Sequence, residues 1–533
     1  MGKVFNVTAD CKPQFHYMVD ISGRLREIAC LVDMGEYFTI NRARQYGKTT
    51  TLRALKQVLE DRYLVVSLDF QKIGDTKFRN ENTFSIAFSR LFLRALCKNE
   101  CSAGSQMEEC VQAFSDAAVK CSGSLELLEM FEYLSDICGA SEKPVVLMID
   151  EVDSAANNQV FLDFLAQLRA YYIDRDVTPA FWSVILAGVY DVKNLKRNIR
   201  TDEEHKVNSP WNIAADFNVE MSFSASDISG MLAEYEADYH TGMDVREISE
   251  ILYEYTSGYP FLVSRLCQIV DERIAGSDGF PKKSLAWTRE GILGAVKLIL
   301  AEKNTLFETL ANKLAEYPEL KEMLYAILFS GDKISFNHDN PVIDLAAMLG
   351  FVKSEQGTMM IANRLFETRL YNLFLSEEEV NSRIFAAGEM DKNQFVRNGI
   401  LDMDLVLRKF MVYWQDLYSR EDEKFIEDNG RKFFLLYLKP IINGAGNYYI
   451  ESRTRDRGRT DVIVDYNGNQ YIVEIKIWRG NEYNKRGERQ LADYMEAYHA
   501  QRGYLLSFNF NKKKETGVKE LQIDGKTIVE VVV

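Results

Sequence analysis

The sequence predicts an α/β multidomain protein with a parallel α/β core near its N-terminus and a second α/β domain at its C-terminus. Two observations predict the first core. One is a strand–helix–strand pattern over residues 37–70 with Gly-Lys-Thr at its first turn, and the other is the apolar run "PVVLMIDEVD". A hairpin pattern around Asn467-Gly468 predicts the second domain. The 533 residues are enough for several such cores.

The composition is that of an ordinary globular protein, with 47% hydrophobic and 27% charged residues. No apolar run approaches the length of a transmembrane helix and no signal-peptide pattern is present, so we expect no membrane partner. The eight cysteines form no Cys-x-x-Cys pair, which predicts reduced thiols and a cytoplasmic location. Because the net charge is −15, any contact with nucleic acid has to be local.

The first motif lies at a strand-to-helix turn. Tyr37–Ile40 and Leu64–Phe70 are predicted strands, and Lys48–Glu60 is a predicted helix with leucines on one face. Such a turn is the context that a phosphate-binding loop needs, so we expect Lys48 to reach the β and γ phosphates of ATP and the Thr49 hydroxyl to bind Mg²⁺. The other residues expected to line this loop are Arg42, Arg44, Gly47 and Thr50.

One departure leaves an alternative open. Arg42 stands where the pattern G-x-x-x-x-G-K-[ST] has its first glycine, so the loop motif alone is also compatible with an ordinary basic turn. The strand that ends in Asp150-Glu151 favours the nucleotide site. There we expect Asp150 to hold Mg²⁺ and Glu151 to polarise the attacking water. A third apolar strand, "FWSVILAGVY", follows at the spacing of a sensor strand.

Together these segments resemble a known family. "HYMVDISGRLREI" leading into "YFTINRARQYGKTT" is similar to the opening of the AAA-ATPase-like family, whose loop also carries arginines in place of the first glycine. The resemblance implies a P-loop ATPase in which Arg42 and Arg44 touch phosphate. "TSGYPFLVSRLC" resembles the segment that opens the helical lid of related ATPases, and Arg265 within it would be a second sensor.

The C-terminal hairpin brings three charges together. A two-residue loop at Asn467-Gly468 pairs Tyr466 with Asn469, and counting outward places Asp461 opposite Glu474. Lys476 points to the same face as Glu474. Facing carboxylates repel each other, which predicts a divalent cation, Mg²⁺ or Mn²⁺, between them. The alternative is a solvated hairpin end with a Glu–Lys surface pair.

The order helix, strand, strand, strand, helix, strand resembles the core of the PD-(D/E)XK nuclease superfamily, which has a restriction-endonuclease-like fold. The resemblance implies that carboxylates hold the metal and that a lysine positions the attacking water. The implied metal ligands are Asp461, Glu474, the Ile475 carbonyl and Glu427 on the first helix. The implied catalytic residues are Asp461, Glu474 and Lys476, with Gln490 and Tyr494 as a Q-x-x-x-Y element.

The complete prediction is a P-loop parallel α/β ATPase core with a helical lid, a winged-helix-like middle and a restriction-endonuclease-like α/β domain. The predicted parts are the core at 1–225, the lid at 226–305, the winged-helix-like domain at 306–385, a helical hinge at 386–419 and the nuclease-like domain at 420–533. The predicted recognition helix, "PVIDLAAML", contains no Lys or Arg, which argues against strong reading of the DNA major groove there.

The predicted function is an ATPase and an ATP-dependent or ATP-regulated, metal-dependent nuclease that acts on DNA. The resemblance implies a role in genome defence or mobile-element biology. An alternative is a nucleotide-binding switch or scaffold that controls an effector without steady ATP turnover. RNA as the target, endonuclease or exonuclease action, and a homo-oligomeric state all stay open at this point.

Overall fold

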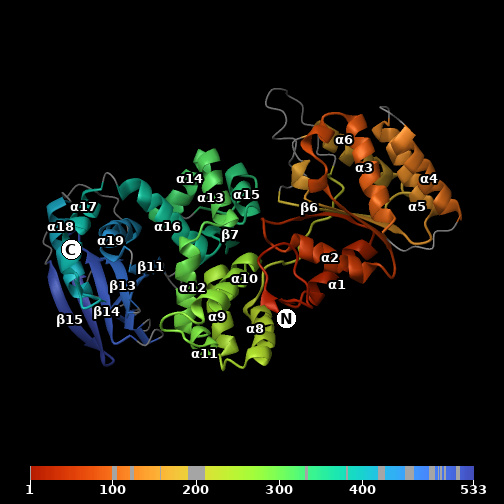
Figure 1. The fold of residues 1–533 in the computed structure, drawn as a ribbon. Helices are drawn as coiled ribbons and strands as arrows, with labels where there is room; N and C mark the ends of the chain where they lie inside the picture. The colour runs from red at the N-terminus through yellow and green to blue at the C-terminus, as the bar shows by residue number, and fades with distance from the viewer. Residues whose placement is uncertain are drawn as a thin grey trace. The chain divides into compact units, whose positions relative to one another are not determined.

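Four parallel strands in the order β3-β6-β5-β4 form a sheet in the N-terminal part of the chain (Figure 1). These strands are β3 (Tyr37–Asn41), β4 (Leu64–Asp69), β5 (Val145–Asp150) and β6 (Ser183–Gly188). Beyond β3, the backbone N–H of Ala215 donates to the carbonyl of Tyr37 at 2.8 Å, so this segment continues the sheet. The predicted strands and the helix that begins at Lys48 are confirmed.

The chain divides into two compact units in the computed structural model. The first consists of Met1–Tyr253, Gly258–Gln268 and Met348–Gly350, and the second of Glu254–Ser257, Ile269–Ala347 and Phe351–Val533. The described residues are 2–98, 105–120, 125–155, 158–189, 211–330, 334–379, 382–417, 427–443, 445–450, 461–467, 469–478, 487–489, 491–492, 495–496, 500–511 and 516–533.

Helices cover both faces of the parallel sheet, as a sheet of this kind requires. On one face, α1 (Ser22–Asp33) and α2 (Lys48–Leu59) pack against a cluster that includes Phe38 and Val146. The opposite face carries a cluster rich in phenylalanine, to which Leu147 contributes. Its helices are α3 (Glu81–Leu96), α4 (Ser105–Lys120), α5 (Leu127–Ala140) and α6 (Gln159–Ile173). Figure 1 shows the two helical layers on opposite sides of the strands.

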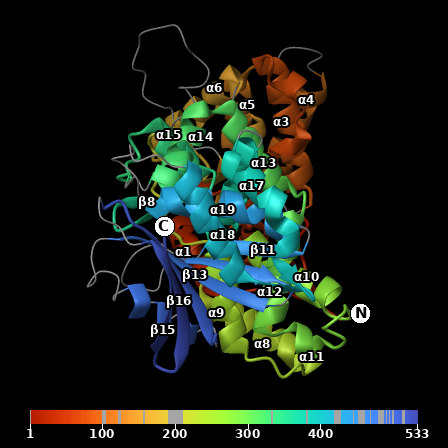
Figure 2. The same cartoon turned by 90° about the vertical axis from the view of Figure 1, so that its left-hand side faces the viewer.

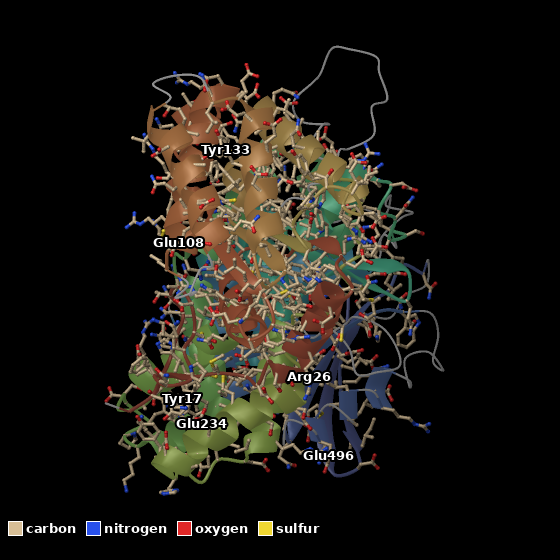
Figure 3. The ribbon with its side chains drawn as sticks, turned by 90° about the vertical axis from the view of Figure 1, so that its right-hand side faces the viewer. Tyr17, Arg26, Glu108, Tyr133, Glu234 and Glu496 are labelled. Atoms are coloured by element: carbon tan, nitrogen blue, oxygen red, sulfur yellow. The ribbon has the colours of Figure 1, made fainter. Side chains whose placement is uncertain are left out.

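The N-terminal segment lies against helix α8 (Ala225–Tyr239). Its short parallel strands are β1 (Val4–Phe5) and β2 (His16–Tyr17), and the helices that follow the sheet are α8 (Ala225–Tyr239), α9 (Val245–Thr256) and α10 (Pro260–Ile269). The Tyr17 hydroxyl donates to Asp238 at 2.7 Å, and Lys3 pairs with Glu234 (Figure 3). Ser224 and Asp227 form a capping box that begins α8.

The second unit begins with a set of helices and a hairpin. These elements are α11 (Lys283–Ala286), α12 (Arg289–Ala301), α13 (Thr305–Glu316), α14 (Pro318–Tyr325), α15 (Pro341–Met348), β7 (Val352–Glu355), β8 (Thr358–Ile361) and α16 (Arg364–Glu378). The winged-helix-like arrangement predicted for residues 306–385 stays a prediction. Before α15, Ser335 forms an isolated bridge with Thr358 of β8.

A mixed six-stranded sheet in the order β11-β12-β13-β14-β16-β15 lies at the C-terminus (Figure 2). Its strands are β11 (Gly446–Ile450), β12 (Asp461–Tyr466), β13 (Asn469–Ile477), β14 (Arg502–Phe508), β15 (Gly517–Ile523) and β16 (Lys526–Val532). The pairs β13–β14 and β14–β16 are parallel and the other pairs are antiparallel. Helices α18 (Met403–Leu417) and α19 (Glu427–Ile442) lie on the face that carries Phe508.

The opposite face of this sheet is covered by helical residues between β13 and β14. Leu491 and Met495 from that stretch pack with Leu505 and Ile528 of the sheet. In β12 and β13, Asp461 pairs with Glu474 and Tyr466 pairs with Asn469. The register predicted from the Asn-Gly turn is therefore confirmed.

The boundaries of the five predicted domains stay predictions. The structure divides the chain into two compact units, and these units do not test the five boundaries. Within the second unit, α17 (Arg383–Asp391) packs closely on α19, so that a Cβ atom on Gly388 would overlap the carbonyl oxygen of Tyr437. Among the described residues, no helix is both long enough and apolar enough to cross a membrane.

Two glycines with similar backbone angles allow a matched test of the packing that precedes α10. Gly258 (φ +71°) and Gly242 (φ +76°) both have left-handed backbones, but only at Gly258 would a Cβ meet another residue, the backbone of Phe223. We expect Gly242→Ala to cost about 1 kcal/mol from backbone strain. Gly258→Ala should cost about 2 kcal/mol more through the overlap, as measured by urea unfolding. Equal losses for the two variants would contradict this close packing.

Candidate functional site

The loop between β3 and α2 is built around two left-handed backbone positions. Gln45 has φ +58°, and Gly47, the residue before α2, has φ +81°. A Cβ on Gly47 would meet no atom within 4 Å, so the glycine is favoured by its backbone angle rather than by space. The turn directs the unpaired N–H groups at the start of α2 toward the loop, an arrangement suited to anions.

Lys48 is the buried cation of this loop. Its side chain is only slightly exposed, and Nζ donates to the carbonyl oxygens of Arg42 at 2.8 Å and Ala43 at 3.0 Å. Burial lowers the pKa of the Lys48 ammonium, and the carboxylates of Asp153 and Glu151 act in the opposite direction. The ammonium has three N–H donors, so it can donate to a phosphate oxygen in addition to these two carbonyls.

Thr49 and Asp150 meet across the carboxyl end of the sheet. The Thr49 hydroxyl donates to Oδ2 of Asp150 at 2.7 Å, and the Glu151 backbone N–H donates to Oδ1 of Asp150 at 3.0 Å. A hydroxyl and a carboxylate oxygen that already converge fit the oxygen ligands and few protein contacts that Mg²⁺ prefers. These two side chains are therefore suited to hold the metal that accompanies a nucleotide.

Glu151 follows in a left-handed conformation, with φ +56° and ψ +42°. This conformation is uncommon for a residue with a Cβ and turns the chain sharply after β5. Its side chain reaches the surface, but the part that stays covered, together with the neighbouring carboxylate of Asp150, raises the pKa of Glu151 above the usual value for glutamate. A carboxylate of raised pKa is a better proton acceptor, as a general base requires.

The two loop arginines have different surroundings. The Arg42 guanidinium donates to the carbonyls of Val219 at 2.9 Å and Asn41 at 3.0 Å, and lies over the ring of Phe217. The side chain of Arg44 is exposed. Contact of either arginine with phosphate stays a prediction. To contact phosphate, the Arg42 guanidinium would have to give up hydrogen bonds to the carbonyls of Asn41 and Val219.

Two further predicted residues have contacts within the first unit. The hydroxyl of Thr50 accepts from the backbone N–H of Cys11 at 3.1 Å, so Thr50 joins the loop to the N-terminal segment. The Arg265 guanidinium on α10 donates to Gln268 at 2.6 Å on the same helix. A sensor role for Arg265 stays a prediction.

The segment that begins α10 touches the phosphate loop directly. The Tyr259 hydroxyl donates to the Arg44 carbonyl at 2.5 Å, and the rings of Tyr259 and Tyr46 meet edge to face at 4.7 Å. The predicted lid segment therefore bonds to the backbone of the loop that is expected to hold nucleotide.

In the C-terminal sheet, Glu474 and Lys476 form a buried ion pair. The Lys476 ammonium lies 2.7 Å from Oε1 of Glu474, and the side chains are 9% and 0% exposed, respectively. This burial does not fit the alternative of a solvated surface pair. Gly487, at the start of the helical stretch that covers this face, lies against the stem of Lys476.

The described residues leave part of the predicted metal site open. Asp461 begins β12 directly opposite Glu474, and Ile475 is the next residue along β13. The side chains of Asp461 and Glu427, and the whole of Gln490 and Tyr494, lie outside the described residues. In the described parts of the chain, no group of three His, Cys, Asp or Glu side chains is placed to hold a metal ion.

Three polar residues near the sites were not predicted from the sequence. Asp153 accepts from the backbone of Val189 in the first unit. In the second unit, Ser507 is in register with Lys476, and Glu530 lies on the same sheet face as Glu474; both are buried. The sequence did hold a signal for Ser507 and Glu530, because each is a polar residue inside an apolar strand, in "LLSFNF" and in "IVEVVV".

Loss of the Lys48 ammonium tests the nucleotide site. We expect Lys48→Ala to weaken Mg·ATP binding at least about tenfold, because a charge-assisted hydrogen bond to phosphate is lost. Isothermal titration calorimetry measures this change. Lys56→Ala is the matched control, since Lys56 lies on the same helix and pairs with exposed Glu60. Equal affinities of both variants for Mg·ATP would contradict the assignment.

The chain is 24% identical over 262 residues to an uncharacterized WD repeat-containing protein of Synechocystis sp., a match that spans 48% of this chain and 20% of that protein. Among solved structures, a Walker-type ATPase of Pyrococcus abyssi superposes with a TM-score of 0.47 at 15% identity, over 69% of this chain and 99% of that one. The ORC2 protein of Aeropyrum pernix superposes with a TM-score of 0.39 at 13% identity, over 70% and 96%.

A family model described as "AAA-like domain" matches residues 21–372. The matched range contains the loop, the two carboxylates at the end of β5 and the helices that follow the parallel sheet. With most of its length matched, this chain belongs to the AAA-like domain family of P-loop ATPases.

Proposed function

We propose that the protein is an ATP-regulated, metal-dependent nuclease that acts on DNA, with ATP bound at the loop before α2 and phosphodiester cleavage at the base of the β12–β13 hairpin. The observation that carries the nuclease half is the buried Glu474–Lys476 pair beside the register partner Asp461. Family membership and the Thr49–Asp150 contact support the ATP half.

At the ATP site, each residue has a role that follows from its chemistry. Lys48 donates to the β and γ phosphates beside its two carbonyl partners. Thr49 and Asp150 would hold Mg²⁺, which supplies positive charge beside the phosphates when it is bound. Glu151 orients and deprotonates the attacking water, a task favoured by its raised pKa.

At the hairpin site, Asp461 and Glu474 hold the metal, and the Ile475 carbonyl is a further oxygen close by. A bound Mg²⁺ or Mn²⁺ would lower the pKa of a water and polarise the phosphorus. Lys476 stabilises negative charge that develops on the scissile phosphate. A cation held by Glu474 would weaken the pair of Lys476 with that carboxylate, and Lys476 could then pair with phosphate oxygens.

ATP turnover separates this proposal from a nucleotide switch. We expect Glu151→Gln to keep Mg·ATP affinity within about threefold and to lower turnover about a hundredfold, because general-base catalysis is lost. Wild-type turnover should also fall as the pH drops through the raised pKa of Glu151, since the protonated acid cannot accept a proton. Phosphate release measures both effects.

Glu142→Gln is the control for this experiment, because the exposed Glu142 precedes the opposite end of β5. It should turn over ATP like the wild type. If the wild type itself hydrolyses ATP no faster than Glu151→Gln, the chain is a switch that binds nucleotide without steady turnover.

Cleavage of circular and linear DNA with Mg²⁺ or Mn²⁺, with and without ATP, tests the nuclease half. We expect Asp461→Asn to reduce cleavage about a hundredfold or more, because a metal ligand supports several kcal/mol of transition-state stabilisation. Asp465→Asn, the same change on the same strand, should cleave like the wild type. Lys48→Ala reports whether nucleotide regulates cleavage.

Absence of wild-type cleavage of DNA with either metal, with and without ATP, would contradict the proposal for DNA. The same assay on single-stranded RNA then decides whether RNA is the substrate. Cleavage by Asp461→Asn at the wild-type rate would place any nuclease activity elsewhere.

A further inference from the structure

The strap, residues 219–223, leads from the parallel sheet to α8. Val219, at its start, is buried in the cluster that packs on the α1 and α2 face of the sheet, and Ser224, directly after it, caps α8. At its end, the backbone N–H of Phe223 donates to the Gly258 carbonyl at 2.8 Å. Movement of the strap would therefore move the start of α8 and disturb the turn before α10.

Arg42 holds the strap from the phosphate loop. Its guanidinium donates to the Val219 carbonyl at 2.9 Å and to the Asn41 carbonyl at 3.0 Å, and it lies over the ring of Phe217. A guanidinium carries its N–H donors in one plane, so it can bond to two carbonyls and stack on a ring at the same time. The position that has glycine in G-x-x-x-x-G-K-[ST] thus carries a side chain that binds the strap.

The backbone of Arg42 connects this side chain to Lys48. The Arg42 carbonyl accepts from Nζ of Lys48 at 2.8 Å, and the Arg42 backbone N–H donates to the Gly188 carbonyl at 3.2 Å. These two bonds hold the peptide groups on both sides of the Arg42 Cα. A phosphate that pairs with Lys48 restricts the ammonium and, through the shared carbonyl, the backbone of Arg42. Opening of the strap, which needs the Arg42 side chain to move away, then becomes rarer.

Arg24 holds the same strap from outside the loop. Its guanidinium, on α1, donates to the carbonyls of Glu220 at 3.0 Å and Ser222 at 3.4 Å, and it lies over the Phe223 ring. The chain therefore offers two arginines with the same kind of contact to one segment. Of these two, Arg42 is the one that belongs to the phosphate loop and bonds to Lys48 through its backbone.

We propose that Arg42 is a positioning residue that couples nucleotide bound at the phosphate loop to the strap, and that it does so without contacting phosphate itself. Bound nucleotide fixes Lys48 and the backbone of Arg42, and the Arg42 guanidinium then keeps Val219 in place. The inference rests on nucleotide binding at the loop before α2, and not on ATP turnover or on the nuclease activity.

The test is amide hydrogen exchange of the full-length wild type, Arg42→Gln and Arg24→Gln, with and without Mg·ADP. We expect Mg·ADP to slow the exchange of strap N–H groups about tenfold in the wild type, because opening becomes rarer. In Arg42→Gln, Mg·ADP should leave this exchange unchanged. Calorimetry should find the Mg·ADP affinity of Arg42→Gln within about threefold of the wild type, whereas loss of a phosphate contact would cost about tenfold or more.

Arg24→Gln is the matched control. The strap should exchange faster in this variant with and without Mg·ADP, but the slowing by Mg·ADP should remain, since Arg24 is not part of the loop. If Arg42→Gln does not fold, Arg42→Met replaces it, because methionine keeps an apolar stem over Phe217 and removes the donors to both carbonyls.

Three results would overturn the proposal. One is a strap that responds to Mg·ADP in Arg42→Gln as it does in the wild type. Another is a tenfold or larger loss of Mg·ADP affinity in that variant, which would identify Arg42 as a phosphate contact. The third is loss of the response in Arg24→Gln as well, or its absence in a wild type that binds Mg·ADP, which would leave both arginines with a structural role alone. A wild type that binds no nucleotide would instead contradict the proposed function.

Discussion

The buried ammonium of Lys48 is the constraint on which the phosphate-binding end of the first unit depends. A charge removed from water is tolerated only when hydrogen bonds replace its hydration, so the loop has to turn the carbonyls of Arg42 and Ala43 inward. The left-handed backbones of Gln45 and Gly47 then return the chain to the start of α2. The loop is therefore already ordered around a cation, and a phosphate adds a partner to that cation rather than creating a site.

The second unit places a cation and an anion together inside a sheet. A buried ion pair contributes little to stability, and an apolar pair of similar volume would often be at least as stable. On the same face of the sheet, Ile472 and Leu505 are buried apolar neighbours of Glu474, and the buried polar residues Ser507 and Glu530 lie there as well. A pair retained under these conditions is better explained by chemistry at the site than by stability, which is why it supports the proposed metal-dependent function.

Local sequence patterns predicted the parts of the structure that depend on neighbouring residues. The Asn467-Gly468 turn determined the pairing of Asp461 with Glu474, and Gly47 marked the start of α2. The contacts that were missed join distant segments. Val219, which binds the guanidinium of Arg42, is 177 residues away from it. Such contacts depend on strand order and on helix packing, which no local propensity encodes, and so the roles of Val219, Asp153 and Glu530 required the structure.

The phosphate loop contacts three separate segments of the first unit, so a nucleotide bound at the loop acts on all three. Lys48 bonds to the Arg42 and Ala43 carbonyls, and Tyr259 bonds to the Arg44 carbonyl. A Cβ on Gly350 would lie 2.9 Å from the Cβ of Ala43, so residues 348–350 of the first unit pack tightly against the same loop. A loop bonded and packed at three successive residues cannot release one without straining the others. A phosphate bound to Lys48 would therefore also act on the contacts of Tyr259 and Gly350, which gives nucleotide a physical route to the segments that follow the parallel sheet.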